Sequence, residues 1–310
     1  NPAAAVVPQV NIHYAAPPTM GRILSSDARV RVVVGPFGSG KSSGCVMEIP
    51  RRAHGQSPAA DGIRHTRFAV IRNTYGQLRD TTKKTFDQWV PPEVGEWHAE
   101  AKTFTMRFGD VHCEVLFRAL DRPEDVRKLL SLELTGAYIN ELREMPKAIF
   151  DGLQGRVGRY PAKKDGGATW WGVWADTNPW HTGHWGYKLF SKDRPEGFEI
   201  YEQPDGLSPE AENLENLNDP RYYQNLSLGK DKEWIDCYVR GKYGTSDKGS
   251  VYGEWLDAME RRGALDEFPT PLDNIFVSWD LGIGDATSMW AWTPKLDGVD
   301  FCDWYEAHGK

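Results

Sequence analysis

The chain has 310 residues, of which 40% are hydrophobic and 26% charged, and its net charge is −7. This is the composition of a globular protein with enough residues for about two domains. No uncharged apolar run approaches the roughly 20 residues of a membrane span, and the first residues do not read as a secretory leader.

Four widely spaced cysteines (Cys45, Cys113, Cys237 and Cys302) form no CxxC pair. This spacing excludes a zinc ribbon and is typical of reduced thiols in a cytosolic protein.

The charge is segregated along the chain. Residues 196–220 hold eight acids and no Lys or Arg, whereas residues 61–90 hold six Lys or Arg against three acids. A negative net charge taken alone argues against a nucleic-acid partner. Because one segment accounts for more than the whole net charge, it excludes no class of partner here.

The first two thirds of the chain alternate strand and helix patterns. After an irregular lead-in over residues 1–29, the patterns predict strands at 31–35, 67–73, 134–140 and 169–177, helices at 42–52, 75–89 and 121–130, and a hairpin of 103–108 with 111–117. Such alternation predicts an α/β domain with a mainly parallel sheet.

The last third changes character. An acidic connector spans about 193–220, a helical patch covers 221–243, and a β-rich stretch is predicted at 274–282, 286–292 and 299–308. Three strands without covering helices rarely form an independent domain. We therefore expect the last domain to be incomplete.

Residues 35–42, Gly35-Pro36-Phe37-Gly38-Ser39-Gly40-Lys41-Ser42, fit the pattern GxxxxGK[ST]; this segment is called the P-loop below. An apolar strand precedes it and a helix that begins with Ser42 and Ser43 follows, which is the context the motif requires. Glycines let consecutive N–H groups point at phosphate oxygens. The motif predicts ATP binding, with Lys41 on the β- and γ-phosphates and the Ser42 hydroxyl on Mg²⁺.

Two further strands end in polar residues that suit nucleotide chemistry. The strand 134–140 ends in Asn140-Glu141, and we assign Glu141 as the residue that polarises the attacking water; a solvated loop glutamate is the alternative. Asn140 stands where an Asp normally helps to hold Mg²⁺, so magnesium affinity should rest more on Ser42. The strand 169–177 leads into Thr177-Asn178-Pro179, which could sense a phosphate or be a plain Asn-Pro turn.

Together these motifs resemble the large terminase subunit of tailed bacteriophages. The resemblance extends to residues 71–86, 130–146, 152–161, 211–223 and 277–288. It implies a P-loop NTPase of the additional-strand, catalytic-glutamate type over residues 1–195, an acidic connector and helical linker over 196–250, and the beginning of an RNase H-like nuclease over 251–310.

The resemblance also implies chemistry and partners. ATP and Mg²⁺ would serve the ATPase, with Thr177 and Asn178 in the coupling motif, and Mg²⁺ or Mn²⁺ would serve the nuclease. Asp280 matches the first nuclease ligand and Asp285 is a weaker candidate. Further ligands would lie beyond Lys310, so this chain is not expected to cut DNA.

The expected partners are double-stranded DNA, the portal protein, the small terminase subunit and further copies in a homo-oligomeric ring, a pentamer by the resemblance. No membrane partner is expected. The place of action would be the host cell cytoplasm, transiently on the procapsid.

One departure concerns arginine. Many relatives carry an Arg within the P-loop, where this chain has Phe37, so an arginine finger must come from elsewhere. Arg127, acting on a neighbouring subunit, is the candidate, with Lys128 as the second choice; a solvent-facing helix residue is the open alternative.

DNA contacts are expected on phosphates, because a motor must grip any sequence. The helix with Arg79, Lys83 and Lys84 is one candidate surface, Arg156 and Arg159 form another, and a solvated charged face is the alternative for each. Other functions that remain open are a helicase-like DNA-dependent ATPase, a small-molecule kinase and an ATP-binding assembly switch with weak hydrolysis.

Overall fold

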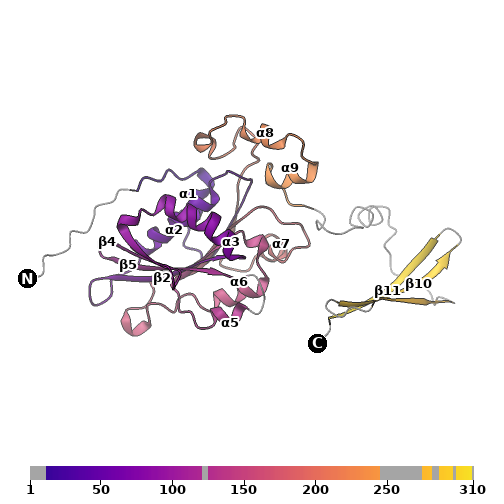
Figure 1. Ribbon diagram of the computed structural model, residues 1–310, viewed down its shortest axis with the longest axis horizontal. Helices are drawn as coiled ribbons and strands as arrows, with labels where there is room; N and C mark the ends of the chain where they lie inside the picture. The colour runs from indigo at the N-terminus through magenta and orange to yellow at the C-terminus, as the bar shows by residue number, and fades with distance from the viewer. Residues whose placement is uncertain (1–11, 121–124, 245–273, 281–285, 296–297, 309–310) are drawn as a thin grey trace, which may run out of the picture. The chain divides into compact units, whose positions relative to one another are not determined.

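The computed structural model describes residues 12–120, 125–244, 274–280, 286–295 and 298–308. The chain divides into two compact units, Asn1–Gly249 and Ser250–Lys310, which Figure 1 displays by residue colour. The nucleotide motifs lie in the first unit, and Asp280 lies in the second.

An eight-stranded sheet forms the centre of the first unit, with the strand order β3-β4-β5-β2-β6-β7-β1-β8. Its strands are β1 (Val30–Val34), β2 (Arg64–Arg72), β3 (Gly95–His98), β4 (Thr103–Phe108), β5 (Val111–Ala119), β6 (Gly136–Asn140), β7 (Gly172–Thr177) and β8 (Phe198–Glu202). The pairs from β5 to β8 are parallel, and β3, β4 and β5 pair antiparallel. The predicted α/β fold with a mainly parallel sheet is thus confirmed.

The central strands are buried along their whole length. All residues of β1, β6 and β7 are buried, which is expected for parallel strands that helices cover on both faces. The hairpin of β4 and β5 turns at Gly109, whose φ of 52° suits a residue without a Cβ. This is the hairpin that the alternating pattern predicts.

Helices cover both faces of the sheet (Figure 1). One face carries α1 (Pro18–Ser25), α2 (Lys41–His54), α3 (Tyr75–Gln77) and α4 (Lys83–Trp89), the last two joined by a π-helical turn, η1 (Leu78–Thr82); the other carries α5 (Val126–Leu129), α6 (Lys147–Gln154) and α7 (Trp185–Tyr187) with the π-helical turn η6 (Lys188–Asp193). Short 3₁₀ turns are η2 (Pro92–Val94), η4 (Leu142–Glu144), η5 (Lys163–Asp165) and η7 (Leu214–Asn216).

Each face has its own hydrophobic core, because successive strand residues point to opposite sides. Val33 and Val70 pack with Ile49 of α2 in one core, whereas Val32 and Ile71 join the core under α6. The sheet is therefore a middle layer between two helical layers.

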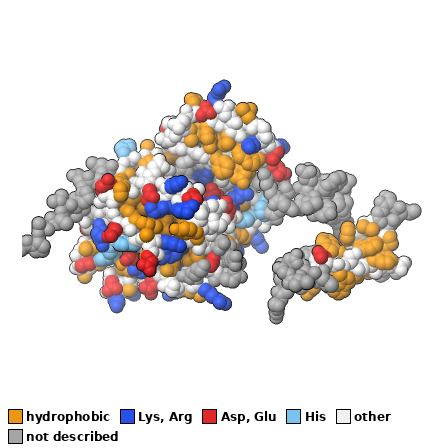
Figure 2. All heavy atoms as spheres, in the orientation of Figure 1, with side chains coloured by type: hydrophobic (Ala, Val, Ile, Leu, Met, Phe, Trp, Pro, Cys, Tyr) orange, Lys and Arg blue, Asp and Glu red, His pale blue; other side chains and the backbone are white. Residues whose placement is uncertain are grey.

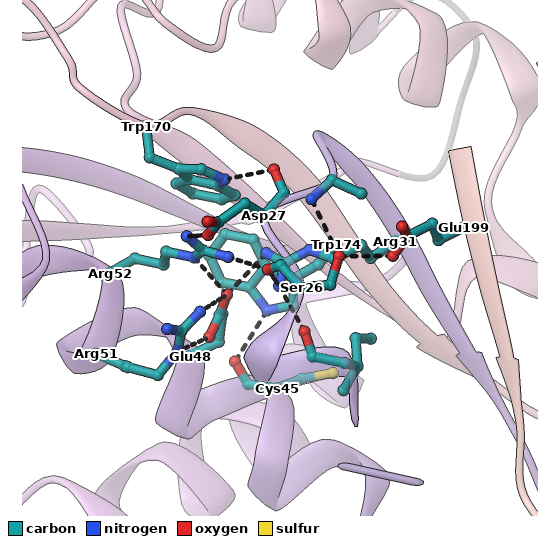
Figure 3. Close-up of polar contacts among 12 residues, drawn as sticks. Ser26, Asp27, Arg31, Cys45, Glu48, Arg51, Arg52, Trp170, Trp174 and Glu199 are labelled. Carbon is teal, nitrogen blue, oxygen red and sulfur yellow. Dashed lines mark hydrogen bonds and ion pairs between the residues drawn. The ribbon is translucent and has the colours of Figure 1, made fainter. Parts of the chain in front are cut away.

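A buried ion cluster fixes α2 to β1. Arg31 on β1 forms an ion pair of 2.7 Å with Glu48 on α2, and Arg52 and Arg51 bind the same carboxylate at 2.7 and 2.6 Å. Figure 3 shows these side chains converging beside Trp170 and Trp174. Because the P-loop lies between β1 and α2, this cluster also fixes both ends of the loop.

Two elements correct the sequence analysis. Helix α1 lies in the lead-in that was expected to be irregular, and it buries Met20 and Ile23, three residues apart on one face. Strand β8 lies within the expected connector 196–250, yet it pairs with β1 along all five of its residues. Its acids, such as Glu199 and Glu202, suit the edge of a sheet, where charge discourages further strand pairing.

Two helices follow β8, namely α8 (Tyr222–Ser227) and α9 (Lys232–Tyr238), within the predicted helical patch. The second unit contains an antiparallel sheet of order β11-β10-β9, formed by β9 (Phe276–Asp280), β10 (Ala286–Lys295) and β11 (Gly298–His308). Several of its large apolar side chains are exposed, including Trp279 and Phe301, and Figure 2 shows hydrophobic side chains over much of its visible face.

Within the residues that the structure describes, no helix has the length and apolar character needed to cross a lipid bilayer.

Candidate nucleotide-binding site

The P-loop connects the end of β1 to the first residue of α2. Gly38 and Gly40 have φ angles of 69° and 80°, a left-handed region that disfavours residues with a Cβ. These glycines curl the chain back toward the N-terminus of a 14-residue helix. Curled backbone N–H groups and the positive end of a helix dipole make a fitting anion site.

Lys41 lies inside this loop. Its Nζ donates to the carbonyl oxygens of Gly35 and Pro36 at 3.0 and 2.5 Å and to Ser39 Oγ at 3.2 Å. Burial lowers the pKa of Lys41, while the nearby carboxylates of Glu141 and Asp176 act in the opposite direction. The ammonium thus sits beside the phosphate cradle and faces two acids.

Residues from the predicted connector and linker cover the outside of the P-loop. Gln203 Nε2 donates to Ser39 O at 2.8 Å, Asn213 Nδ2 to Gly38 O at 2.7 Å, and Tyr223 OH to Phe37 O at 2.7 Å. A Cβ at Gly35 would come within 2.3 Å of Gln203 Oε1, so the close approach requires glycine. These contacts could not be predicted from the sequence, because a run of acids does not indicate which segment it will contact.

Phe37 stacks on Tyr238 of α9 with ring centroids 4.6 Å apart and planes at 20°. Its ring also lies 6.1 Å from that of Trp234, and its N–H donates to Tyr238 O at 2.8 Å. The loop apex is therefore attached to the linker helices.

Glu141 follows β6 directly and has a left-handed backbone, with φ 57° and ψ 64°. Its N–H donates to Asp176 Oδ1 at 3.1 Å, and its Oε2 accepts from the N–H of Asn178 at 3.4 Å. Burial, together with the charge of Asp176, raises the pKa of Glu141, and Lys41 and Arg72 oppose this. A non-glycine residue held in this region is frequent at functional sites.

The turn at Thr177-Asn178 joins Glu141 to the P-loop. Asn178 Nδ2 donates to Gly35 O at 2.8 Å, and Gly35 N–H donates to Thr177 O at 3.2 Å. Thr177 Oγ1 accepts from the N–H of Arg143 at 3.2 Å. A displacement of the P-loop would therefore change the position of Glu141 through this turn.

Arg143 extends this chain of contacts to the linker. Its Nη1 donates to Pro179 O at 3.0 Å and to Cys237 Sγ at 3.2 Å, and the guanidinium lies 5.5 Å from the ring centroid of Tyr238. The end of β6, the turn after β7 and helix α9 thus meet at one side chain.

Ser42 and Asn140 meet at Asp176, a residue to which the sequence reasoning assigned no role. Ser42 Oγ donates to Asp176 Oδ2, and Asn140 Nδ2 donates to Asp176 Oδ1 at 2.9 Å. Asp176 ends β7 beside Asn140 in register. The rule that carboxyl ends of parallel strands meet at one edge could have identified it.

A cavity of about 150 Å³ lies beside Ser42. Residues that line it include Ser42, Arg72, Tyr138, Asn140 and Glu141. Arg72 was also missed: it ends β2, pairs with Glu144 at 3.2 Å and donates to Asn140 O at 3.2 Å. A larger hollow of about 470 Å³, lined by Arg29, Trp171 and their neighbours, contains none of the predicted site residues.

The side chains beside the P-loop suit Mg²⁺, which needs few protein ligands, better than a metal that is bound by protein side chains alone. Among the described residues, no three His, Cys, Asp or Glu side chains gather as a metal-binding group. Mg²⁺ keeps several waters and takes one or two protein oxygens plus substrate phosphates. The hydroxyl of Ser42 beside the carboxylate of Asp176 is such a pair.

Among the other predicted residues, Arg127 does not line the cavity beside Ser42. Arg127 is exposed on α5, and the side chain of Lys128 is outside the description. Asp280 is exposed at the end of β9 in the second unit, and Asp285 lies outside the described residues.

Acidic side chains of the same segment pair with part of the positive charge on the basic helix. Arg79 pairs with Asp80 at 2.7 Å and Lys83 with Asp87 at 2.5 Å, while Lys84 is exposed. The contact of this face with DNA stays a prediction.

No model of a known protein family matches the sequence, and no curated protein matches it. Solved structures do match. The large terminase from a thermophilic bacteriophage superimposes with a TM-score of 0.61 at 15% identity, over 95% of this chain and 69% of that one. The same protein in complex with ADP gives a TM-score of 0.57 at 16% identity, over 94% and 68%.

Two other phages provide similar structures. The ATPase domain of the Thermus phage P74-26 large terminase matches with a TM-score of 0.51 at 13% identity, over 74% of this chain and 94% of that domain. The HK97 bacteriophage large terminase gives 0.54 at 10% identity, over 94% and 63%. The central sheet with its P-loop and flanking helices thus gives this chain the fold of the phage large terminases.

Proposed function

We propose that this chain is the ATP-hydrolysing subunit of a phage DNA-packaging motor. The observation that carries the proposal is the meeting of Lys41, Ser42, Glu141 and Asn178 at the carboxyl edge of a sheet that has the fold of large terminases. Neighbours of this fold have been captured with ADP and with ATP-gamma-S.

The residues of the site divide the work of hydrolysis. The P-loop N–H groups and Lys41 hold and orient the phosphates. Ser42 would offer its hydroxyl to a bound Mg²⁺, which would supply charge neutralisation to the phosphates. Glu141, ionised, accepts a hydrogen bond from the attacking water and takes its proton.

Coupling to movement would run through Thr177 and Asn178. This turn contacts both Gly35 of the P-loop and Glu141, so a change at the phosphates alters the position of the base. Arg143 carries the change to Cys237 on α9, in the linker that leads toward the second unit.

The wider proposal covers partners and the nuclease. The partners are double-stranded DNA, a portal protein, a small terminase subunit and further copies in a ring, in the host cytoplasm and on the procapsid. The antiparallel sheet with Asp280 at the end of β9 supports a nuclease start, in which Asp280 would be one ligand of a divalent metal.

The test is Glu141→Gln. We expect ATP to bind with nearly the wild-type affinity, because the loop and Lys41 are intact, and we expect hydrolysis to fall about 10²–10⁴-fold with loss of the general base. A fluorescent ATP analogue measures binding, and phosphate release measures turnover, with and without DNA and portal-bearing procapsids.

Asp151→Asn is the matched control, because Asp151 pairs with Lys147 on the exposed face of α6. It should hydrolyse ATP like the wild type. Undiminished turnover in Glu141→Gln would show that Glu141 is not the general base. Stimulation of the wild type by a small metabolite rather than by procapsids and DNA would favour a kinase instead.

A further inference from the structure

Strand β6, which leads to Glu141, lacks the carboxylate that usually accompanies a P-loop serine. In P-loop ATPases an acid on that strand and the loop Ser or Thr hold Mg²⁺ together, and here the position is Asn140. Its Oδ1 accepts from Thr82 Oγ1 at 2.7 Å, and its Nδ2 faces Asp176 at 2.9 and 3.1 Å. This orientation is the one that avoids placing two oxygens together.

Asp176 occupies the neighbouring position across the sheet. It lies on β7, directly opposite Asn140 in the parallel register of β6 and β7, and its side chain is fully buried. Its Oδ2 accepts the hydrogen of Ser42 Oγ. A carboxylate on the P-loop hydroxyl is the contact that the missing acid would have made.

The remaining partners of Asp176 are neutral. Tyr138 OH and the N–H of Glu141 each donate to Oδ1 at 3.1 Å. Among the described residues, no Lys, Arg or His lies within ion-pair distance of it. Neutral donors orient a carboxylate without cancelling its charge, and a buried uncancelled charge is costly.

The local charge balance points the same way. Lys41 interacts electrostatically with both Glu141 and Asp176, and the nearby Arg72 is paired with Glu144. Three carboxylates therefore face two cations. Phosphates would add more negative charge to this place. A divalent cation is the group that would restore the balance.

We propose that Asp176 is the carboxylate that holds the Mg²⁺ of the bound nucleotide together with Ser42, and that Asn140 orients it. The inference rests on the proposed ATPase function and deepens it. The metal-binding carboxylate would then lie on β7, two residues before Asn178, rather than on β6 at the position of Asn140. The proposed metal ligand and the turn at Thr177-Asn178 therefore both lie at the end of β7.

The experiment uses the full chain with Mn²⁺ as a spectroscopic substitute for Mg²⁺. Nucleotide-dependent Mn²⁺ binding is measured by electron paramagnetic resonance, and the affinity for a fluorescent ATP analogue is measured in EDTA and in Mg²⁺. In Asp176→Asn we expect Mn²⁺ affinity in the nucleotide complex to fall about 10–100-fold, while binding in EDTA, which depends on Lys41 and the loop, stays at the wild-type level.

A second variant keeps the test decisive if Asp176→Asn does not fold. Asn140→Asp/Asp176→Asn exchanges the two side chains and conserves both volume and charge. We expect it to melt like the wild type and to recover most of the Mn²⁺ affinity. Asp151→Asn, which removes a carboxylate from the exposed pair on α6, should bind Mn²⁺ as the wild type does.

The outcomes separate the two claims. Wild-type Mn²⁺ affinity in Asp176→Asn, or a folded double variant without recovered affinity, would overturn this inference alone. Metal-dependent nucleotide binding without any stimulation of turnover by DNA or procapsids would contradict the packaging function alone. A wild-type chain that binds no nucleotide would overturn both.

Discussion

Glu48 on α2 is a buried carboxylate with three arginines around it. Arg31 and Glu48 have side chains that are only 1% and 2% exposed, and Arg31 Nη1 also donates to Ile23 O at 2.8 Å. Burial lowers the pKa of Arg31, and Glu48 acts against that shift. The cluster thus depends on one acid that cancels the charge of Arg31.

We predict that Glu48→Gln destabilises the first unit by about 3–5 kcal/mol, because it leaves the buried charge of Arg31 without its partner. Urea unfolding followed by tryptophan fluorescence measures this. The control Asp151→Asn, in an exposed pair, should cost at most about 0.5 kcal/mol. Equal midpoints for the two variants would contradict the prediction.

Also at the residue scale, the carboxylates of Glu141 and Asp176 have different surroundings. Glu141 reaches the turn at Asn178, whereas Asp176 is enclosed by donors and holds Ser42. In the proposed mechanism Glu141 activates the attacking water and Asp176 holds the cation. The two proposed tasks of hydrolysis then lie at the same edge of the sheet.

At the scale of elements, helices α8 and α9 cover the P-loop. Phe37 is the anchor, since its ring stacks on Tyr238 and its carbonyl oxygen accepts from Tyr223. Strand β8 supports the same arrangement, because Gln203 follows it directly and bonds to Ser39 O.

We predict that Phe37→Ala loosens α9 without unfolding the sheet. An aromatic pair contributes about 0.5–1.5 kcal/mol beyond its buried area, so amide exchange in α9 should accelerate about 2–10-fold. Hydrogen exchange by mass spectrometry measures this locally. Leu228→Ala, at a side chain that is 73% exposed, is the control; unchanged exchange in α9 of the Phe37 variant would refute the anchor.

At the scale of the whole molecule, the arginine finger is proposed to come from another copy, because Arg72, which lines the cavity beside Ser42, is already paired with Glu144. Arg127 is exposed on α5 and does not line the cavity beside Ser42. We therefore propose that Arg127 acts on the nucleotide of a neighbouring copy. This is consistent with a ring, in which each seam brings one chain to the site of the next.

We predict that Arg127→Ala folds and binds ATP as a single chain, but loses assembly-dependent turnover by about 10³-fold, as when an arginine finger is removed. Phosphate release on portal-bearing procapsids is the measurement. Mixing this variant with Glu141→Gln should restore part of the activity, because some seams then combine an intact base with an intact finger. No recovery on mixing would argue against action between subunits.

The central strands and the nucleotide motif follow from the sequence alone. Strands β1, β2, β6 and β7 and the hairpin of β4 and β5 lie where the patterns place them, since alternation and apolar runs depend on neighbours within a few residues. The P-loop is equally local: the spacing of its glycines and Lys41 is contained in eight residues.

The surroundings of that motif depend on contacts between residues that are far apart in the chain. Ser42 and Asp176 are 134 residues apart, Asn213 and Gly38 are 175 apart, and Tyr223 and Phe37 are 186 apart. A side chain's partner across the sheet depends on strand order and register, which no local pattern encodes. For the same reason, β8 and α1 could not be predicted from their polar, Pro-rich segments. Their few apolar residues stabilise these elements only by packing into hydrophobic cores that distant segments form.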